Sequence, residues 1–269
     1  MDHFPTPPSY LEMPHTAQIV YTIIWAVVVA GFIGYAVVEI ARRRGPLLAV
    51  LLIGGAVAYF NEPIDDVLGL VWHPRPNMWV ALDTFSPVPL WGVFVYMALF
   101  GGIPYLMYRA FQRGVTAKQV WIWVGVFWIA DIAVEIPAIN SGMYTYYGEP
   151  PFKVFGLPLY WFAINIGGPI ETAVLLLVFC SLFTGWRMLL LVPIPMVLDA
   201  AGSVGIGWPI FSALHAEASM PVKYLTAILT IAFAVVMLQL TIRYAAEHRG
   251  AVRGTPDAAH RETQPAVGG

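Results

Sequence analysis

Residues 46–70 read PLLAVLLIGGAVAYFNEPIDDVLGL, and this stretch decides the fold. It begins as an uncharged apolar run, and it is longer than the ~20 residues that an α-helix needs to cross the hydrocarbon core of a bilayer. Its second half carries Glu62, Asp65 and Asp66 within five residues. The stretch therefore predicts a membrane-spanning helix that ends in a cluster of carboxylic acids.

The composition of the whole chain agrees with a membrane protein. Hydrophobic residues make up 59% of the 269 residues and charged residues only 11%, with a mean hydropathy of +0.71. Soluble domains carry about 25% charged residues, so this chain has too few to cover a globule with polar surface. The net charge of −2 gives no indication of a nucleic-acid partner, and a lone cysteine, Cys180, excludes a disulfide within the chain.

Seven apolar stretches are long enough to span a bilayer. They cover approximately residues 17–41, 46–70, 88–108, 119–139, 158–184, 187–208 and 222–244. We therefore predict an all-α fold, a polytopic membrane helix bundle with seven transmembrane helices. Its partners are expected to be the lipid bilayer and a lipophilic small molecule.

The basic residues indicate how the chain crosses the membrane. With seven spans, eleven of the fourteen Lys and Arg residues fall on one side, and only Arg75, Lys153 and Lys223 fall on the other. Because cytoplasmic loops are enriched in Lys and Arg, this skew predicts a multi-pass plasma-membrane protein with its N-terminus outside and its C-terminus in the cytoplasm. We expect an extracytoplasmic segment at 1–16, a membrane domain at 17–244 and a disordered cytoplasmic tail at 245–269.

Five carboxylic acids within the spans form the predicted acid/base set. Asp131 and Glu135 are four residues apart and share one helix face, and the others are Glu62, Glu171 and Asp199. An ionised side chain at the bilayer centre costs at least ~2.5 kcal/mol, so we expect these acids to turn inward to a shared cavity that opens to the outer face.

Further polar and aromatic residues are predicted to bind substrate at this cavity. They are Asn61, Asp65, Asn165, Tyr146 and Trp161, with Asn165 and Tyr146 as orienting or oxyanion-type partners. Asp65 and Asp66 are weaker candidates, because acids at a helix end often lie in the headgroup region. His73 is interpreted as a solvated loop histidine rather than a proton relay.

The remaining inventory favours proton transfer without a cofactor. None of the six histidines lies in the middle of a span, which argues against intramembrane haem or a His-rich metal site, and we expect no metal. Lys223 lies at the outer edge of the last span, so a retinal-binding protein is not expected. Carboxyl, amide and phenol groups in an apolar cage suit dehydration, hydration or cyclisation of a lipophilic substrate through a cation.

Four segments between residues 55 and 210 carry a resemblance. They are YFNEPIDDVLGLVWHP (59–74), DTFSPVPLW (83–91), DIAVEIPAINSGMYTYYG (131–148) and PLYWFAINIGGPIE (158–171). In order and spacing they resemble the AveC-like spirocyclase family. The protein that gives this family its name dehydrates and spirocyclises a dihydroxy-ketone polyketide in avermectin-type biosynthesis. The resemblance implies a membrane cyclase or dehydratase, and it assigns no catalytic residue.

Other functions stay open at this point. GMYTYYG (142–148), followed by a proline-rich span, also resembles membrane carotenoid hydratases. A transporter or lipid-binding scaffold would also show broken helices and midplane acids, although we find no internal repeat. A prenyltransferase that binds diphosphate through Mg²⁺ ranks below the metal-free hypothesis, because only Arg75 and Lys153 lie near the acids.

Overall fold

The computed structural model describes residues 5–248, and within that range seven helical spans are long and apolar enough to cross a membrane. Three of them are single helices, namely α1 (His15–Ala41), α6 (Ala117–Asn140) and α11 (Met220–His248). This confirms the predicted all-α bundle of seven transmembrane helices.

The other four spans are built from consecutive shorter segments. The second contains α2 (Leu47–Ala58), η1 (Tyr59–Asn61) and α3 (Glu62–Gly69), and the third contains α4 (Leu90–Tyr96), η2 (Met97–Gly102) and α5 (Ile103–Gln112). The fifth contains α7 (Tyr160–Asn165), α8 (Gly167–Phe179) and η3 (Cys180–Leu182). The sixth contains η4 (Gly185–Leu191), α9 (Ile194–Ala200), η5 (Ala201–Gly205) and α10 (Ile206–His215). Among them, η2 and η5 are π-helical, a geometry that often marks functional positions.

The sixth span is longer than the sequence indicated. It was predicted to end at residue 208, but α10 continues to His215 with Pro209 inside it. Local π-helical adjustments re-satisfy backbone groups freed by proline in membrane helices, and η5 directly precedes this position. At the C-terminus, α11 extends four residues into the predicted tail, to His248. Residues 249–269, the rest of that tail, lie outside the described residues, as do residues 1–4.

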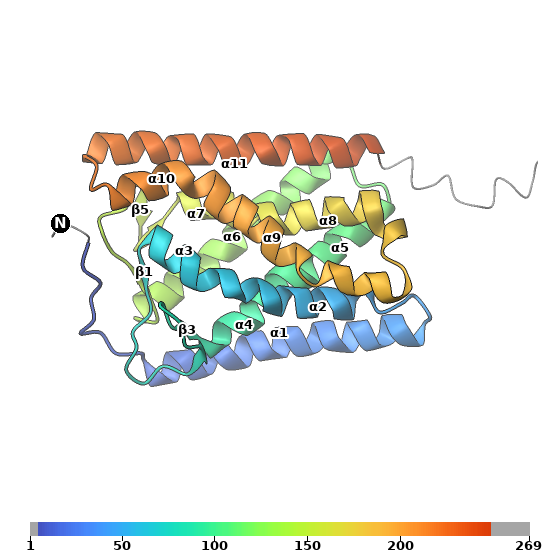
Figure 1. The fold of residues 1–269 in the computed structure, drawn as a ribbon, viewed down its shortest axis with the longest axis horizontal. Coiled ribbons are helices and arrows are strands. Elements are labelled where there is room, and N and C mark those ends of the chain that lie inside the picture. Colours follow the sequence, from blue (N-terminus) through green and yellow to red (C-terminus); the bar gives the residue numbers. More distant parts are fainter. Residues whose placement is uncertain (1–4, 249–269) are drawn as a thin grey trace, which may run out of the picture.

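The helices run roughly along the long axis of the molecule, with α1 and α11 on opposite edges in Figure 1. The short strands gather at the end near the N-terminus. There β1 (Val71–Trp72) pairs antiparallel with β4 (Thr145–Tyr146), β2 (Val80–Leu82) with β3 (Val88–Pro89), and β5 (Lys153–Val154) with β6 (Leu157–Pro158). Only the β2–β3 and β5–β6 pairs join consecutive strands, and the sequence predicted none of the three ladders.

Two glycines let α2 and η2 pack with their backbones in contact. A Cβ added to Gly55 would lie 2.7 Å from the Tyr96 carbonyl oxygen, and one on Gly101 would lie 2.5 Å from the Leu51 carbonyl oxygen. Small residues at helix interfaces permit such close approach in membranes. The contact holds the third span against the second, which brings Tyr96 within reach of Glu62.

The outward faces of α1 and α6 carry exposed apolar side chains. Val27 on α1 is 66% exposed and Ile129 on α6 is 70% exposed, with Ile23, Ile122 and Val126 also exposed. Side chains of this kind are costly in water and neutral in lipid, so these faces fit contact with the acyl chains of a bilayer. Other residues of the same two helices line a cavity inside the bundle.

Candidate functional site

A cavity of about 300 Å³ lies inside the bundle, toward the end that carries the short strands. Eight of the ten predicted site residues line it, namely Glu62, Asp65, Asp131, Glu135, Tyr146, Trp161, Asn165 and Asp199. They come from α3, α6, β4, α7 and α9, so residues far apart in the sequence meet in one place. Asn61 lies behind the wall and contacts Asp199. Glu171, on α8, is partly exposed and does not line the cavity.

The α6 wall carries two acids with separate hydrogen-bond partners. Glu135 Oε2 accepts hydrogen bonds from the hydroxyls of Tyr144, at 2.9 Å, and Tyr146, at 3.3 Å. Asp131 Oδ2 accepts one from the Asn165 amide at 3.3 Å. Burial, followed by the nearby Glu135 carboxyl, raises the pKa of Tyr144 and Tyr146 well above the usual value for tyrosine. Both phenols therefore stay protonated and remain donors to Glu135.

A second pair of acids, Asp65 and Asp199, joins the second span to the sixth. The Asn61 amide donates to Asp199 Oδ2 at 2.8 Å and to the Met196 carbonyl oxygen at 2.7 Å. The Ser203 hydroxyl, in the π-helical segment η5, donates to Asp65 Oδ1 at 3.0 Å. Each of these acids is thus held by a neutral donor, which is how buried polar groups are normally satisfied.

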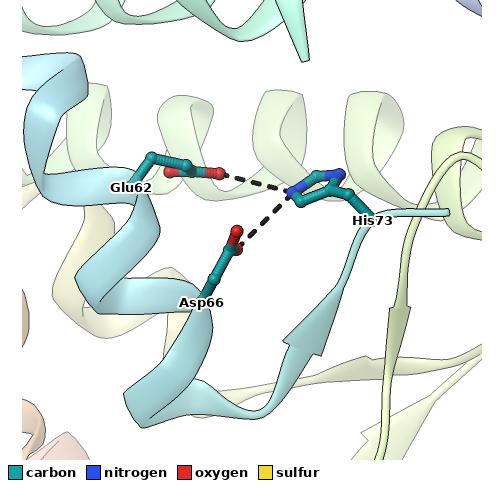
Figure 2. Close-up of side chains that lie close together, drawn as sticks. All are labelled: Glu62, Asp66 and His73. Carbon is teal, nitrogen blue, oxygen red and sulfur yellow. Dashed lines mark ion pairs between the residues drawn. The ribbon is translucent and has the colours of Figure 1, made fainter. Parts of the chain in front are cut away.

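The third group is the cluster of Glu62, Asp66 and His73, shown in Figure 2. Helix α3 ends at Gly69, and the left-handed backbone of the next residue, Leu70 (φ 55°), turns the chain into β1 and brings His73 back to the helix. The His73 Nε2 atom lies 3.5 Å from Asp66 Oδ1 and 3.7 Å from Glu62 Oε1. Burial of the imidazole opposes protonation, but the Asp66 and Glu62 carboxylates outweigh it and raise the pKa of His73 to about 10.

The environments of His73 and Asp66 differ from those predicted from the sequence. The interpretation of His73 as a solvated loop residue is wrong, because only 5% of it is exposed. Asp66 is 2% exposed and faces the cavity, so it does not lie at a headgroup surface. The sequence did hold one signal for Asp66, because Glu62 and Asp66 have the same four-residue spacing as Asp131 and Glu135. The return of His73 depends on the turn at Leu70, which no sequence pattern announced.

Apolar and aromatic side chains form the rest of the cavity wall. They include Trp25, Phe32, Trp91, Phe100 and Phe127. Two lining residues, Val28 on α1 and Ala130 on α6, are also exposed. Both lie at mid-length of their helices. The cavity therefore reaches the lateral surface of the bundle near the mid-length of α1 and α6.

Comparisons with known proteins found no match for this chain. No protein-family model matches the chain, and neither a curated protein nor a solved structure matches it.

Proposed function

We propose that this protein is an integral membrane enzyme of the cyclase or dehydratase type, which acts by acid/base chemistry on a lipophilic polyketide or isoprenoid. The observation that carries the proposal is the cavity itself, in which six carboxylic acids from three spans face one mostly apolar space. These acids are Glu62, Asp65, Asp66, Asp131, Glu135 and Asp199.

The lateral opening supports a lipophilic substrate. Val28 and Ala130 connect the cavity to the surface at mid-length of α1 and α6, where acyl chains would surround the bundle. A volume of about 300 Å³ is at the lower end of small-molecule pockets, which span ~300–1,000 Å³. A hydrophobic molecule dissolved in the bilayer would enter sideways without crossing water.

The α6 wall has the parts for proton transfer. A protonated Glu135, oriented by Tyr144 and Tyr146, donates its proton to a substrate hydroxyl. The C–O bond breaks, water leaves, and the carbon becomes a carbocation or an oxocarbenium ion. Loss of a proton to a neighbouring carboxylate such as Asp131 gives an alkene, whereas attack by a second substrate hydroxyl, followed by the same proton loss, closes a ring.

The cavity walls suit the cationic intermediate. Aromatic faces attract cations, and Trp91 and Tyr144 stack with their ring centroids 6.2 Å apart beside the acids. Carboxylates stabilise developing positive charge most strongly where water is excluded. Addition of water across a double bond is the reverse of the dehydration, so a hydratase uses the same groups. The resemblance to AveC-like spirocyclases agrees with this class of reaction.

The test is a metabolite comparison of a deletion strain complemented by variants. We expect Glu135→Gln to abolish conversion of the accumulating lipophilic precursor while the protein still reaches the membrane. The control is Asp83→Asn, an exposed loop carboxylate, which retains conversion. Full conversion by both Glu135→Gln and Asp131→Asn would refute the acid/base proposal. Flux of an unchanged solute in proteoliposomes would identify a transporter instead.

We also propose that the strand-bearing end of the bundle faces the outside of the plasma membrane, as the distribution of basic residues indicates. Asp83 lies at that end and Arg113 in the loop between α5 and α6. In a variant without Cys180, Asp83→Cys should react with a membrane-impermeant maleimide on intact cells, whereas Arg113→Cys should react only after lysis. The opposite pattern would reverse the orientation.

A further inference from the structure

We propose that Glu62, Asp66 and His73 bind one divalent first-row transition metal ion, of which Zn²⁺ is the representative. The site comes from two adjacent turns of α3 and the loop after β1 (Figure 2). It shares the cavity with the acids of α6 and α9 but uses none of them as ligands, and its existence does not depend on the reaction proposed above.

The geometry of the cluster matches the space around a single ion. One ligand atom from each residue lies within 4.8 Å of the others. Two ligands placed ~2.0–2.2 Å from a tetrahedral zinc ion are about 3.4 Å apart. The His73 Nε2 atom lies 3.5 Å and 3.7 Å from the two carboxylate oxygens, which is close to that spacing.

The carboxylate oxygens that would bind the ion are not the ones that the neighbouring hydroxyl groups contact. The Tyr96 hydroxyl donates to Glu62 Oε2 at 2.6 Å, and the Ser86 hydroxyl lies 3.5 Å from Asp66 Oδ2. The remaining oxygens, Oε1 of Glu62 and Oδ1 of Asp66, are those that face His73. A hydrogen bond to the carboxylate oxygen that does not bind the metal commonly orients the ligand side chain. Tyr96 is therefore a positioning residue for this site.

His73 supplies an independent observation. It is 5% exposed, and in the described part of the chain neither ring nitrogen has a hydrogen-bond partner. A buried polar atom without a partner is costly, and coordination would satisfy Nε2. The ring is held in place by Trp91 and Tyr144, whose ring centroids lie 5.9 Å and 5.4 Å away.

The negative charge of the two carboxylates favours binding of a divalent cation. Among the described residues that line the cavity there is no lysine or arginine beside Glu62 and Asp66, and a protonated His73 balances only one of these two carboxylates. One imidazole and two carboxylates suit Zn²⁺, Mn²⁺ or Fe²⁺, whereas Mg²⁺ and Ca²⁺ prefer oxygen ligands alone. Three protein ligands leave a coordination position free, and all three residues line the cavity. An ion here would face a substrate oxygen or a water molecule.

The experiment measures metal directly in the full-length protein in nanodiscs. The protein is stripped with a chelator, dialysed against Zn²⁺ and analysed by mass spectrometry for metal content, with Mg²⁺ in parallel. We expect about one Zn²⁺ per chain and no stable Mg²⁺. His73→Gln and Asp66→Asn should lose the ion, and Tyr96→Phe should weaken binding by about tenfold or more while leaving all ligands present. His15→Gln, on the exposed start of α1, should retain it.

The outcomes separate this proposal from the proposed function. If the stripped wild-type protein takes up no Zn²⁺, Mn²⁺ or Fe²⁺, the proposal is overturned, and a protonated His73 accounts for the cluster. If His73→Gln and Asp66→Asn bind as much metal as His15→Gln, the ion belongs elsewhere and the proposal is equally overturned. Neither result bears on conversion by Glu135, which is assayed separately.

Discussion

The hydrogen bond between Asn61 and Asp199 fixes the second span against the sixth, and its removal has a calculable cost. Asn61→Ala loses two bonds, one to Asp199 Oδ2 at 2.8 Å and one to the Met196 carbonyl oxygen at 2.7 Å. Asp199 is only 4% exposed, so bulk water has little access to the acceptor that loses its donor. Leaving a buried acceptor unsatisfied costs ~1–3 kcal/mol. We expect Asn61→Ala to destabilise the protein by about 2–3 kcal/mol.

A double-mutant cycle isolates the single bond to Asp199. The Met196 bond is lost in Asn61→Ala whether or not Asp199 is present, so it cancels from the coupling energy. Side-chain bonds between membrane helices average ~0.6 kcal/mol and reach ~1.7 kcal/mol. Because this acceptor is a buried carboxyl, we expect a coupling of about 1–2 kcal/mol between Asn61→Ala and Asp199→Ala.

The assay is unfolding in mixed detergent micelles, followed by tryptophan fluorescence and circular dichroism, for wild type, both single variants and the double variant. The control cycle pairs Asn61→Ala with Gln239→Ala, which breaks the bond to Trp121 in another part of the bundle and should be additive. A coupling below about 0.5 kcal/mol between Asn61 and Asp199 would refute the reasoning, since distant sites are additive within that limit.

Three further outcomes follow from the structure. Tyr144→Phe should lower turnover, measured as initial rates, by about 10- to 100-fold, because it removes the 2.9 Å hydrogen bond to Glu135. Tyr146→Phe should lower turnover by less, because its hydrogen bond to Glu135 is 3.3 Å long. Equal rates for both variants and wild type would contradict this role. Gly101→Leu should cost about 1–3 kcal/mol of unfolding free energy by overpacking against Leu51, whereas Gly125→Leu, with nothing within 4 Å, should cost little. Ala130→Trp should block substrate uptake from lipid vesicles, while Ile129→Trp on the exposed face should not; equal uptake would place the opening elsewhere.

The sequence predicted the spans well because hydrophobic length is a local property. The second span was placed at 46–70 and lies at Leu47–Gly69, and the fourth was placed at 119–139 and lies at Ala117–Asn140. The π-helical segments and the paired short strands were not predicted, because both depend on packing between segments distant in the chain. The extension of the sixth span past Pro209 was missed for the same reason.

The site was predictable where the membrane penalises charge. Asp131, Glu135 and Asp199 were placed at a common cavity because lipid would reject them, and they do line one. Glu171 met the same criterion but does not line the cavity, since the sequence does not reveal which face of α8 turns inward. His73 lies outside the spans, so the cost of placing a charge in lipid does not predict its position.

The two-residue ladder between β1 and β4 has a consequence for how this chain tolerates insertions and deletions. Val71 pairs with Tyr146 and Trp72 with Thr145, so one ladder ties the segment that leads to His73 to the segment that carries Tyr144 and Tyr146. Side chains alternate along a strand, and a shift of one residue turns each of them to the opposite side. A single-residue indel on either strand would therefore misplace the imidazole or the phenols together with their partners. The neighbouring turn at 83–85, which is exposed, should accept added residues freely.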